Sequence, residues 1–304
     1  MIYKHRKKPE ELIVLGQLKK RMDLSSTEEQ HYFSLKKGYE GEVIFDSYTK
    51  KLQCPCLILN DLLFEVNRTT FQIDSLILLQ EKIYYYEVKN LEGDYYYEGN
   101  KFFQKPKIER LNPLHQLERG SSLFYQLLRE QGISPPIDPS IVFINPGFTL
   151  YQAPLDKPII FPTQVKRHLG YINGLPSKIS ERHRQLANQL VNLHVTNSPY
   201  KRVPTFKYQQ IRKGITCLKC ASFAITIDKF SCICKRCKNT ETVSDAILRS
   251  VKEFKILFPD EKITTNTIYN WSNEMVSKRR ISRVLSIHFK IVGVRQWAYY
   301  EENL

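Results

Sequence analysis

Residues 72–90 read QIDSLILLQEKIYYYEVKN, and this stretch decides the fold prediction. Two apolar, β-rich runs flank a polar turn at residues 80–81, a pattern typical of a β-hairpin. A turn at this place sets Asp74 opposite Glu87. Because side chains alternate along a strand, Glu87 and Lys89 share one face, and Asp74 lies across from them on that face. The hairpin therefore gathers two carboxylates and a lysine on one side of a predicted sheet.

This grouping has a chemical consequence, because two carboxylates that face each other on a buried sheet repel unless a cation lies between them. Mg²⁺ prefers oxygen ligands and takes one or two protein carboxylates, which leaves room for water and phosphate oxygens. Lys89 would orient the attacking water or stabilise charge on a phosphate. The pattern predicts a Mg²⁺ (or Mn²⁺) site suited to phosphodiester hydrolysis. The alternative is a structural ion pair, but a carboxylate at Asp74 within an apolar run is costly unless it is paired.

Helical and β-rich segments surround the hairpin. Helices are expected at residues 10–22, 27–52, 113–130 and 178–195, and a further short strand at residues 141–144. This mixture of strands and helices predicts an α/β fold.

Four motifs flank or overlap the hairpin: Gly38-Tyr39-Glu40-Gly41-Glu42, Gln72-Ile73-Asp74, Glu87-Val88-Lys89-Asn90 with Gly93, and Asn112-Pro113-Leu114-His115-Gln116. In their order and spacing, residues 35–150 resemble the nuclease-related domain, NERD, which is similar to the PD-(D/E)XK nuclease superfamily. The resemblance implies a restriction-endonuclease-like mixed sheet flanked by helices, and a metal-dependent nuclease. The Pro-Asp pair of the superfamily is replaced here by Ile73-Asp74.

The resemblance also implies a role for each charged or polar residue of these motifs. Asp74 and Glu87 would bind magnesium, and Lys89 would be the catalytic lysine. Glu42, on the helix before the sheet, would be an additional carboxylate of the metal site, or else a solvated helix residue. Gln116, at the start of the following helix, would support the site or contact the substrate, or else cap its helix. A site with this layout can also bind DNA without cutting it.

Five of the seven cysteines lie between residues 217 and 237, which favours a metal site over a disulfide framework. Two CxxC pairs, Cys217 with Cys220 and Cys234 with Cys237, can offer four thiolates to one tetrahedral ion. They predict a zinc ribbon with a structural Zn²⁺, because four thiolates leave no open position. Cys232 competes with Cys234, but its spacing to Cys237 is looser, so we expect Cys232 to be a strand residue.

The chain is strongly basic, with a formal net charge of +15 over 304 residues. Residues 201–304 hold 20 basic and 9 acidic side chains, and so carry most of the excess. Such a charge favours a polyanionic partner, nucleic acid first and an acidic membrane surface second. No apolar run reaches the roughly 18 residues of a transmembrane helix, and no signal peptide is recognisable. We therefore expect a cytoplasmic protein that binds nucleic acid, DNA in particular, and does not enter a membrane.

The C-terminal residues have the outline of a helix-turn-helix. An amphipathic helix ends at Pro259, and two shorter helices follow. The second of these carries Lys278, Arg279 and Arg283 largely off its apolar stripe. A winged strand pair is expected around residues 292–300. The alternative is a basic, solvated helix face on an accessory domain.

Together these observations predict five segments: an N-terminal helical extension (1–34), a NERD nuclease-like domain (35–196), a linker (197–214), a zinc ribbon (215–241) and a basic helical or winged-helix-like module (242–304). The predicted function is a metal-dependent DNA nuclease whose ribbon and C-terminal module aid nucleic-acid binding. The first alternative is a non-catalytic DNA-binding or regulatory protein built on the same fold. The second is a protein-interaction adaptor, in which the ribbon and tail grip another chain.

Overall fold

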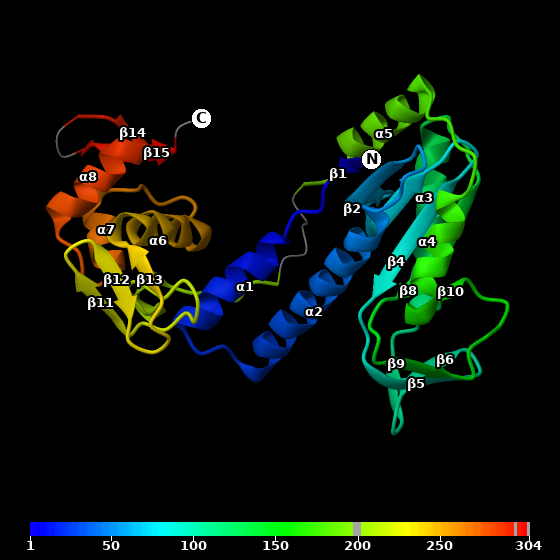
Figure 1. Ribbon diagram of the computed structural model, residues 1–304, viewed down its shortest axis with the longest axis horizontal. Coiled ribbons are helices and arrows are strands. Elements are labelled where there is room, and N and C mark those ends of the chain that lie inside the picture. Colours follow the sequence, from blue (N-terminus) through cyan, green and yellow to red (C-terminus); the bar gives the residue numbers. More distant parts are fainter. Residues whose placement is uncertain (197–201, 295–296, 303–304) are drawn as a thin grey trace. The chain divides into compact units, whose positions relative to one another are not determined.

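The computed structural model describes residues 1–196, 202–294 and 297–302 (Figure 1). The chain divides into two compact units. Unit 1 contains Met1–Pro9 and Phe33–Lys201, and unit 2 contains Glu10–Tyr32 and Arg202–Leu304. Within the described ranges, every helix is too short or too polar to cross a membrane.

Unit 1 is built on a six-stranded mixed sheet with the strand order β1-β2-β3-β4-β8-β10. Its strands are β1 (Ile2–Lys4), β2 (Leu57–Val66), β3 (Thr69–Leu78), β4 (Ile83–Lys89), β8 (Ile137–Phe143) and β10 (Ile159–Ile160). The pairs β2–β3 and β3–β4 are antiparallel, whereas the pairs β1–β2, β4–β8 and β8–β10 are parallel.

Helices cover both faces of this sheet (Figure 1). They are α2 (Ser26–Thr49), of which the part from Phe33 belongs to unit 1, α3 (Pro113–Glu130), α4 (Val165–Asn173) and α5 (Glu181–Leu193), with a 3-10 turn at Pro162–Gln164 before α4. Because neighbouring strand residues point to opposite faces, Tyr85 packs against α3 and α5, while Tyr84 and Tyr86 pack against α2 and α4. The predicted mixed sheet flanked by helices is confirmed.

A second, four-stranded sheet completes unit 1, in the order β7-β6-β5-β9. It consists of β5 (Gly93–Glu98), β6 (Lys101–Gln104), β7 (Ile108–Arg110) and β9 (Phe148–Tyr151). Phe148 stacks on Phe143 of β8, with 3.9 Å between the ring centroids, so the two sheets share a hydrophobic core.

Unit 2 joins the cysteine module, the C-terminal helices and an N-terminal helix. Its elements are α1 (Glu10–Arg21), a 3-10 turn (Tyr208–Gln210), β11 (Ile225–Asp228), β12 (Ser231–Cys234), β13 (Thr240–Thr242), α6 (Val243–Leu257), α7 (Thr265–Trp271), α8 (Lys278–His288), β14 (Phe289–Val292) and β15 (Tyr299–Glu302). One hydrophobic cluster connects them, with Leu18 of α1, Cys232 of β12 and Trp271 of α7 among its members.

A buried ion network reinforces this core. Arg21 of α1 donates to the Glu253 carboxylate of α6 at 2.5 Å, and Arg249 contacts the same carboxylate at 3.1 Å. Arg249 also binds Glu241 at 2.5 Å and the Thr216 carbonyl at 2.6 Å, next to the first CxxC pair. The network therefore joins α1 and α6 to Glu241 of β13 and to Thr216. Removal of one partner would leave an uncompensated buried charge, which is strongly destabilising.

The two units divide the chain differently from the five predicted segments. Of the expected extension 1–34, residues 1–9 add β1 to the sheet of unit 1, while α1 packs into unit 2. The expected ribbon and C-terminal module share one hydrophobic core. The expected linker begins in residues 197–201, which lie outside the described residues. The pairing of β1 with β2 and the packing of α1 into unit 2 join segments that are far apart in the chain. Hydrophobic periodicity reports only on local structure, so it does not predict these contacts.

Candidate functional site

Strands β3 and β4 form the hairpin expected from the sequence. The antiparallel ladder ends at the pair Ser75–Tyr86, so Asp74 and Glu87 come next in register. The Asp74 carboxylate accepts a hydrogen bond from the backbone N–H of Val88 at 2.7 Å. The hairpin therefore places Asp74 and Glu87 side by side where the ladder ends.

Strand β2 has an irregularity beside Asp74. Asp61 has a φ of +56°, in the left-handed region, and no ladder pair joins it to Asp74. As a result the alternation of side chains breaks: Ile73 and Leu76, three residues apart, both lie in the cluster that faces α3. The Asp74 carbonyl accepts a hydrogen bond from Arg6 at 2.7 Å. The irregular backbone thus opens the sheet to an arginine at this point.

Glu87, Lys89 and Gln116 form a hydrogen-bonded triangle. The Lys89 ammonium donates to Glu87 at 2.7 Å and to Gln116 at 2.8 Å, and the Gln116 amide donates to Glu87 at 2.5 Å. Gln116 lies in the first turn of α3, whose N-terminus is capped by the Asn112 side chain accepting from the Leu114 N–H. The Glu87 side chain is 4 % exposed and that of Lys89 is 21 % exposed. Lys89 therefore connects a buried carboxylate to the solvent.

Glu42 lies on α2 and is held by an arginine that was not predicted. Arg6, which follows β1, contacts Glu42 at 2.5 Å and Asp46 at 2.9 Å. The Arg6 side chain is only 3 % exposed. The same guanidinium reaches the Asp74 carbonyl, so Arg6 fixes α2 relative to β3 at the candidate site.

The electrostatics of the site indicate an excess of negative charge. Burial raises the pKa of Asp74 well above its usual value, and the Glu87 and Glu42 carboxylates raise it further. Lys89 and the Val88 N–H only partly offset these effects. Burial also raises the pKa of Glu42, although Arg6 opposes the shift. A divalent cation would supply the missing positive charge, and the carboxylate oxygens suit Mg²⁺ or Mn²⁺.

The carboxylates of Glu42, Asp74 and Glu87 do not form a compact three-ligand cluster. In the described part of the chain, only the cysteine cluster brings three or more His, Cys, Asp or Glu ligand atoms within 4.8 Å of one another. At least one distance among Glu42, Asp74 and Glu87 is therefore longer. Since Arg6 already binds Glu42, the donor set fits a cation held mainly by Asp74 and Glu87, with Glu42 assisting.

Two further side chains order the site, and no role for either is evident from the sequence motifs. Arg6 lies outside those motifs, although the β-prone Ile2-Tyr3 before it is a signal for a strand. Asn90 follows Lys89, donates to the Lys37 carbonyl of α2 at 2.6 Å, and lies against Gly41. A Cβ atom at Gly41 would come within 2.5 Å of the Asn90 side chain, which explains a glycine inside this helix.

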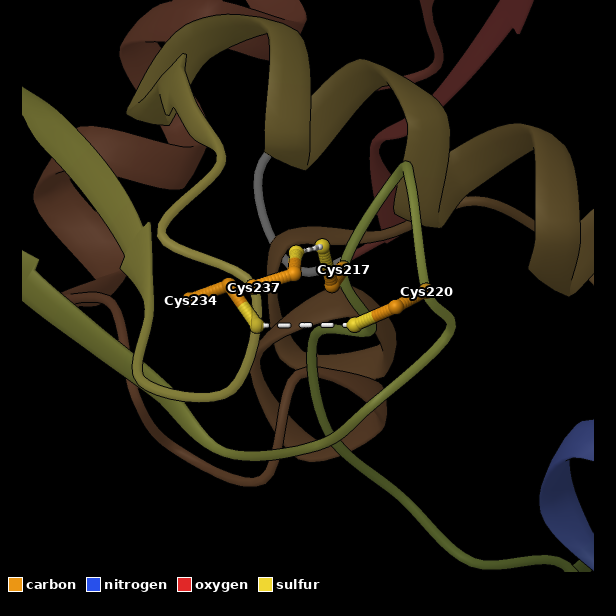
Figure 2. A group of neighbouring side chains, drawn as sticks. All are labelled: Cys217, Cys220, Cys234 and Cys237. Atoms are coloured by element: carbon orange, nitrogen blue, oxygen red, sulfur yellow. Dashed lines mark hydrogen bonds between the residues drawn. The ribbon is translucent and has the colours of Figure 1, made fainter.

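The four cysteines of the two CxxC pairs converge in unit 2 (Figure 2). The sulfurs of Cys217 and Cys237 are 3.5 Å apart, and those of Cys220 and Cys234 are 3.6 Å apart. Tetrahedral Zn–S bonds of ~2.3 Å place sulfurs about 3.8 Å apart, so the cluster can hold a zinc ion with little adjustment.

Local backbone groups favour the thiolate form of Cys234, and they distinguish it from its competitor, whereas at Cys237 the Asn239 N–H is outweighed by burial and the neighbouring cysteines, which raise the pKa of Cys237 to about 12. The N–H groups of Cys237 and then Arg236 lower the pKa of Cys234 to about 6, although burial opposes them. Cys232 instead lies buried in the hydrophobic core of unit 2, and burial raises its pKa to about 11. Cys232 is therefore a strand residue of β12, outside the cluster.

One known protein family matches the part of the chain that contains the hairpin. Residues 37–144 match the family model of the nuclease-related domain, NERD. The match spans about a third of the chain and includes Glu42, Asp74, Glu87, Lys89 and Gln116. No curated protein and no solved structure matches the chain. The resemblance seen in the sequence motifs is confirmed.

Proposed function

We propose, from the nuclease-related domain at residues 37–144, that this protein is a divalent-metal-dependent nuclease that hydrolyses phosphodiester bonds in DNA. One observation supports this most directly. Glu87 is opposite the buried Asp74 in the hairpin register and is hydrogen-bonded to both Lys89 and Gln116. The carboxylates that act on Asp74 outweigh the charge of Lys89. A structural ion pair would need no such excess of negative charge.

Asp74 and Glu87 would hold Mg²⁺ or Mn²⁺ through their carboxylate oxygens, and Glu42 would add negative charge beside them. When bound, the cation supplies positive charge to the phosphate oxygens and lowers the pKa of water. Arg6 would keep Glu42 and the Asp74 backbone in place. The carboxylates would thus remain ionised because a cation offsets their mutual repulsion.

Lys89 would act on the reacting groups directly. An ammonium has three donors, and two of those of Lys89 bind Glu87 and Gln116. The third would donate to the attacking water or to a phosphate oxygen in the transition state. Gln116 would hold the ammonium in this orientation, because it bonds both Lys89 and Glu87.

Unit 2 would supply binding to nucleic acid. The cysteine cluster would hold a structural Zn²⁺ that shapes the ribbon, because four thiolates fill a tetrahedral ion. The excess of basic over acidic side chains in residues 201–304 would attract the phosphate backbone. The same features suit a non-catalytic DNA-binding protein, so cleavage has to be measured.

The test is a nuclease assay on linear, circular and single-stranded DNA, with Mg²⁺, with Mn²⁺ and without divalent cation. The variants are Lys89→Ala and Asp74→Ala, and we expect each to lower the cleavage rate by a factor of about 10² to 10⁴ while DNA binding persists. Lys82→Ala is the matched control. Lys82 immediately precedes β4 and forms an exposed ion pair with Asp138 at 3.1 Å, so its loss should leave cleavage unchanged.

Cleavage that survives both substitutions would refute the assignment of the site. If the wild-type protein binds DNA but cuts none of these substrates, the non-catalytic alternative takes its place.

A further inference from the structure

The C-terminal part of unit 2 has the chain order of a winged helix-turn-helix. Helices α6, α7 and α8 pack against one another, and the antiparallel pair β14–β15 follows α8. Ile263, between α6 and α7, forms a β-bridge with Tyr300 of β15, with the Tyr300 N–H donating to the Ile263 carbonyl at 2.8 Å. Residues 295–296, between β14 and β15 in the chain, lie outside the described residues.

Helix α8 presents one apolar and one basic face. Ile281, Val284 and Leu285 are buried in the core of unit 2. Arg279 and Arg283, one turn apart, are exposed and have no partner among the described residues. The helix contains no carboxylate, so nothing on it neutralises these arginines.

A hollow of about 480 Å³ lies where α8 meets the ribbon. Its wall includes Arg279, Arg280 and Arg283 of α8, Ser244 at the start of α6, and Phe230 from the β11–β12 turn. No carboxylate is present among the described residues that line it. Three guanidinium groups around one hollow repel one another in the absence of an anion, so the chemistry of the wall favours a phosphate.

The ribbon forms part of this hollow through Arg280. The Arg280 guanidinium lies over the Phe230 ring, 5.5 Å from its centroid, and donates to the Lys229 carbonyl. These contacts engage Arg280, whereas Arg279 and Arg283 remain available to a ligand. Phe230 itself is 76 % exposed at the rim.

We propose that this surface binds duplex DNA, with α8 in the major groove and the phosphate backbone in the arginine-lined hollow beside the ribbon turn. An exposed basic helix fits the ~12 Å wide major groove of B-DNA, whereas the major groove of duplex RNA is too deep and narrow for it. Single-strand binders instead use grooves lined with stacked aromatic side chains, and the described residues around this hollow offer only Phe230. This inference deepens and rests on the proposed function, because it specifies the form of DNA that the protein would engage.

The experiment measures binding without cleavage. Full-length Lys89→Ala protein, in buffer without added divalent cation, is titrated into three labelled ligands and followed by fluorescence anisotropy. The ligands are a 20-base-pair DNA duplex, one of its single strands, and an RNA duplex of the same sequence. The Arg279→Gln/Arg283→Gln double variant is compared with Lys252→Gln/Arg202→Gln, which removes the same charge from exposed positions of unit 2 outside the hollow.

We expect the DNA duplex to bind more tightly than the other two ligands. The arginine double variant should weaken duplex binding at least about tenfold and reduce the slope of log Kd against log salt by about two, since two phosphate contacts are lost. The control double variant should change Kd by no more than about twofold. An Arg279→Lys/Arg283→Lys variant should recover most of the affinity, because it keeps the charge.

Tighter binding of single-stranded DNA or duplex RNA by the wild-type surface would overturn the inference, as would an arginine variant that binds the duplex like the control. Because this experiment measures binding and no cleavage, failure of this inference is distinguishable from failure of the nuclease proposal, which the cleavage assay tests separately.

Discussion

Asp74 occupies a position where its own charge is destabilising. It is 7 % exposed, it lies beside Glu87, and its carboxylate has the Val88 N–H as its hydrogen-bond donor. Burial and the neighbouring carboxylates raise its pKa well above the usual value. Residues that hold a metal often have this property, because the fold accepts a charge that only the cation compensates.

This environment predicts that Asp74→Asn stabilises the metal-free protein. Because the pKa of Asp74 is higher in the folded than in the unfolded chain, its ionisation lowers stability as the pH rises through the folded-state value. The amide removes that loss and keeps an acceptor for the Val88 N–H. At pH 8, without divalent cation, we expect the free energy of unfolding of unit 1 to rise by roughly 1–3 kcal/mol. The difference should shrink as the pH falls towards ~4.

Urea denaturation at pH 5 and pH 8 measures this effect. Asp138→Asn serves as the control, because Asp138 forms an exposed ion pair with Lys82, and its loss should lower stability by at most about 1 kcal/mol. Mg²⁺ should stabilise the wild type more than Asp74→Asn. Equal stabilisation of both proteins, or a destabilised Asp74→Asn at pH 8, would contradict the charge argument.

At the level of elements, helix α2 shows how one glycine sets the spacing of the site. The helix runs unbroken from Ser26 to Thr49 although it contains Gly38 and Gly41, two residues that disfavour helix. Gly41 is buried against Asn90, whereas a Cβ atom at Gly38 would meet nothing within 4 Å. Only Gly41 is therefore required for the approach of α2 to the end of β4.

The two glycines predict opposite effects of the same substitution. Gly41→Ala should lower the free energy of unfolding by about 1–3 kcal/mol and reduce cleavage, because the new methyl group displaces Asn90 and with it the neighbouring Lys89. Gly38→Ala should raise stability by about 0.5–1 kcal/mol through helix propensity and leave cleavage unchanged. Denaturant unfolding and the nuclease assay measure both. Equal effects of the two substitutions would show that α2 does not pack on Asn90 as described.

At the level of the whole molecule, each unit has its own core and its own candidate metal site. Unit 1 holds the carboxylate site and two hydrophobic clusters on its sheet, and unit 2 holds the cysteine cluster and a core that includes Trp271. A ligand that binds only the folded form of one unit stabilises that unit by mass action. The two units should therefore respond to different metals.

We expect two thermal transitions with separate metal dependence. Mg²⁺ should raise the midpoint of the unit 1 transition, whereas a zinc chelator should lower only the unit 2 transition, because zinc binding contributes folding energy. Cys234→Ala should reduce zinc from about one ion per chain to none, since it removes one of four ligands. Cys232→Ala, a buried cysteine of the same strand, should keep the zinc. Calorimetry and zinc analysis of the purified proteins test this, and zinc loss in Cys232→Ala alone would reverse the ligand assignment.

Much of this organisation can be read from local sequence. The hairpin register follows from two apolar runs around one polar turn, because the period of a strand is set by the backbone itself. The gathering of Cys217, Cys220, Cys234 and Cys237 follows likewise from the short, regular spacing of two CxxC pairs. In both cases the residues that meet are close in sequence, so few intervening residues affect how they are placed.

The remainder was decided by contacts between residues far apart in the chain. Arg6 meets Glu42 and Asp74, Gln116 meets Lys89 over 27 residues that include β5, β6 and β7, and Arg21 meets Glu253 over 232 residues. Each contact depends on how elements pack, and packing is set by the whole set of buried side chains rather than by any segment. For this reason local spacing indicated which carboxylates form the candidate site, while only the tertiary structure identified the arginine that holds them in place.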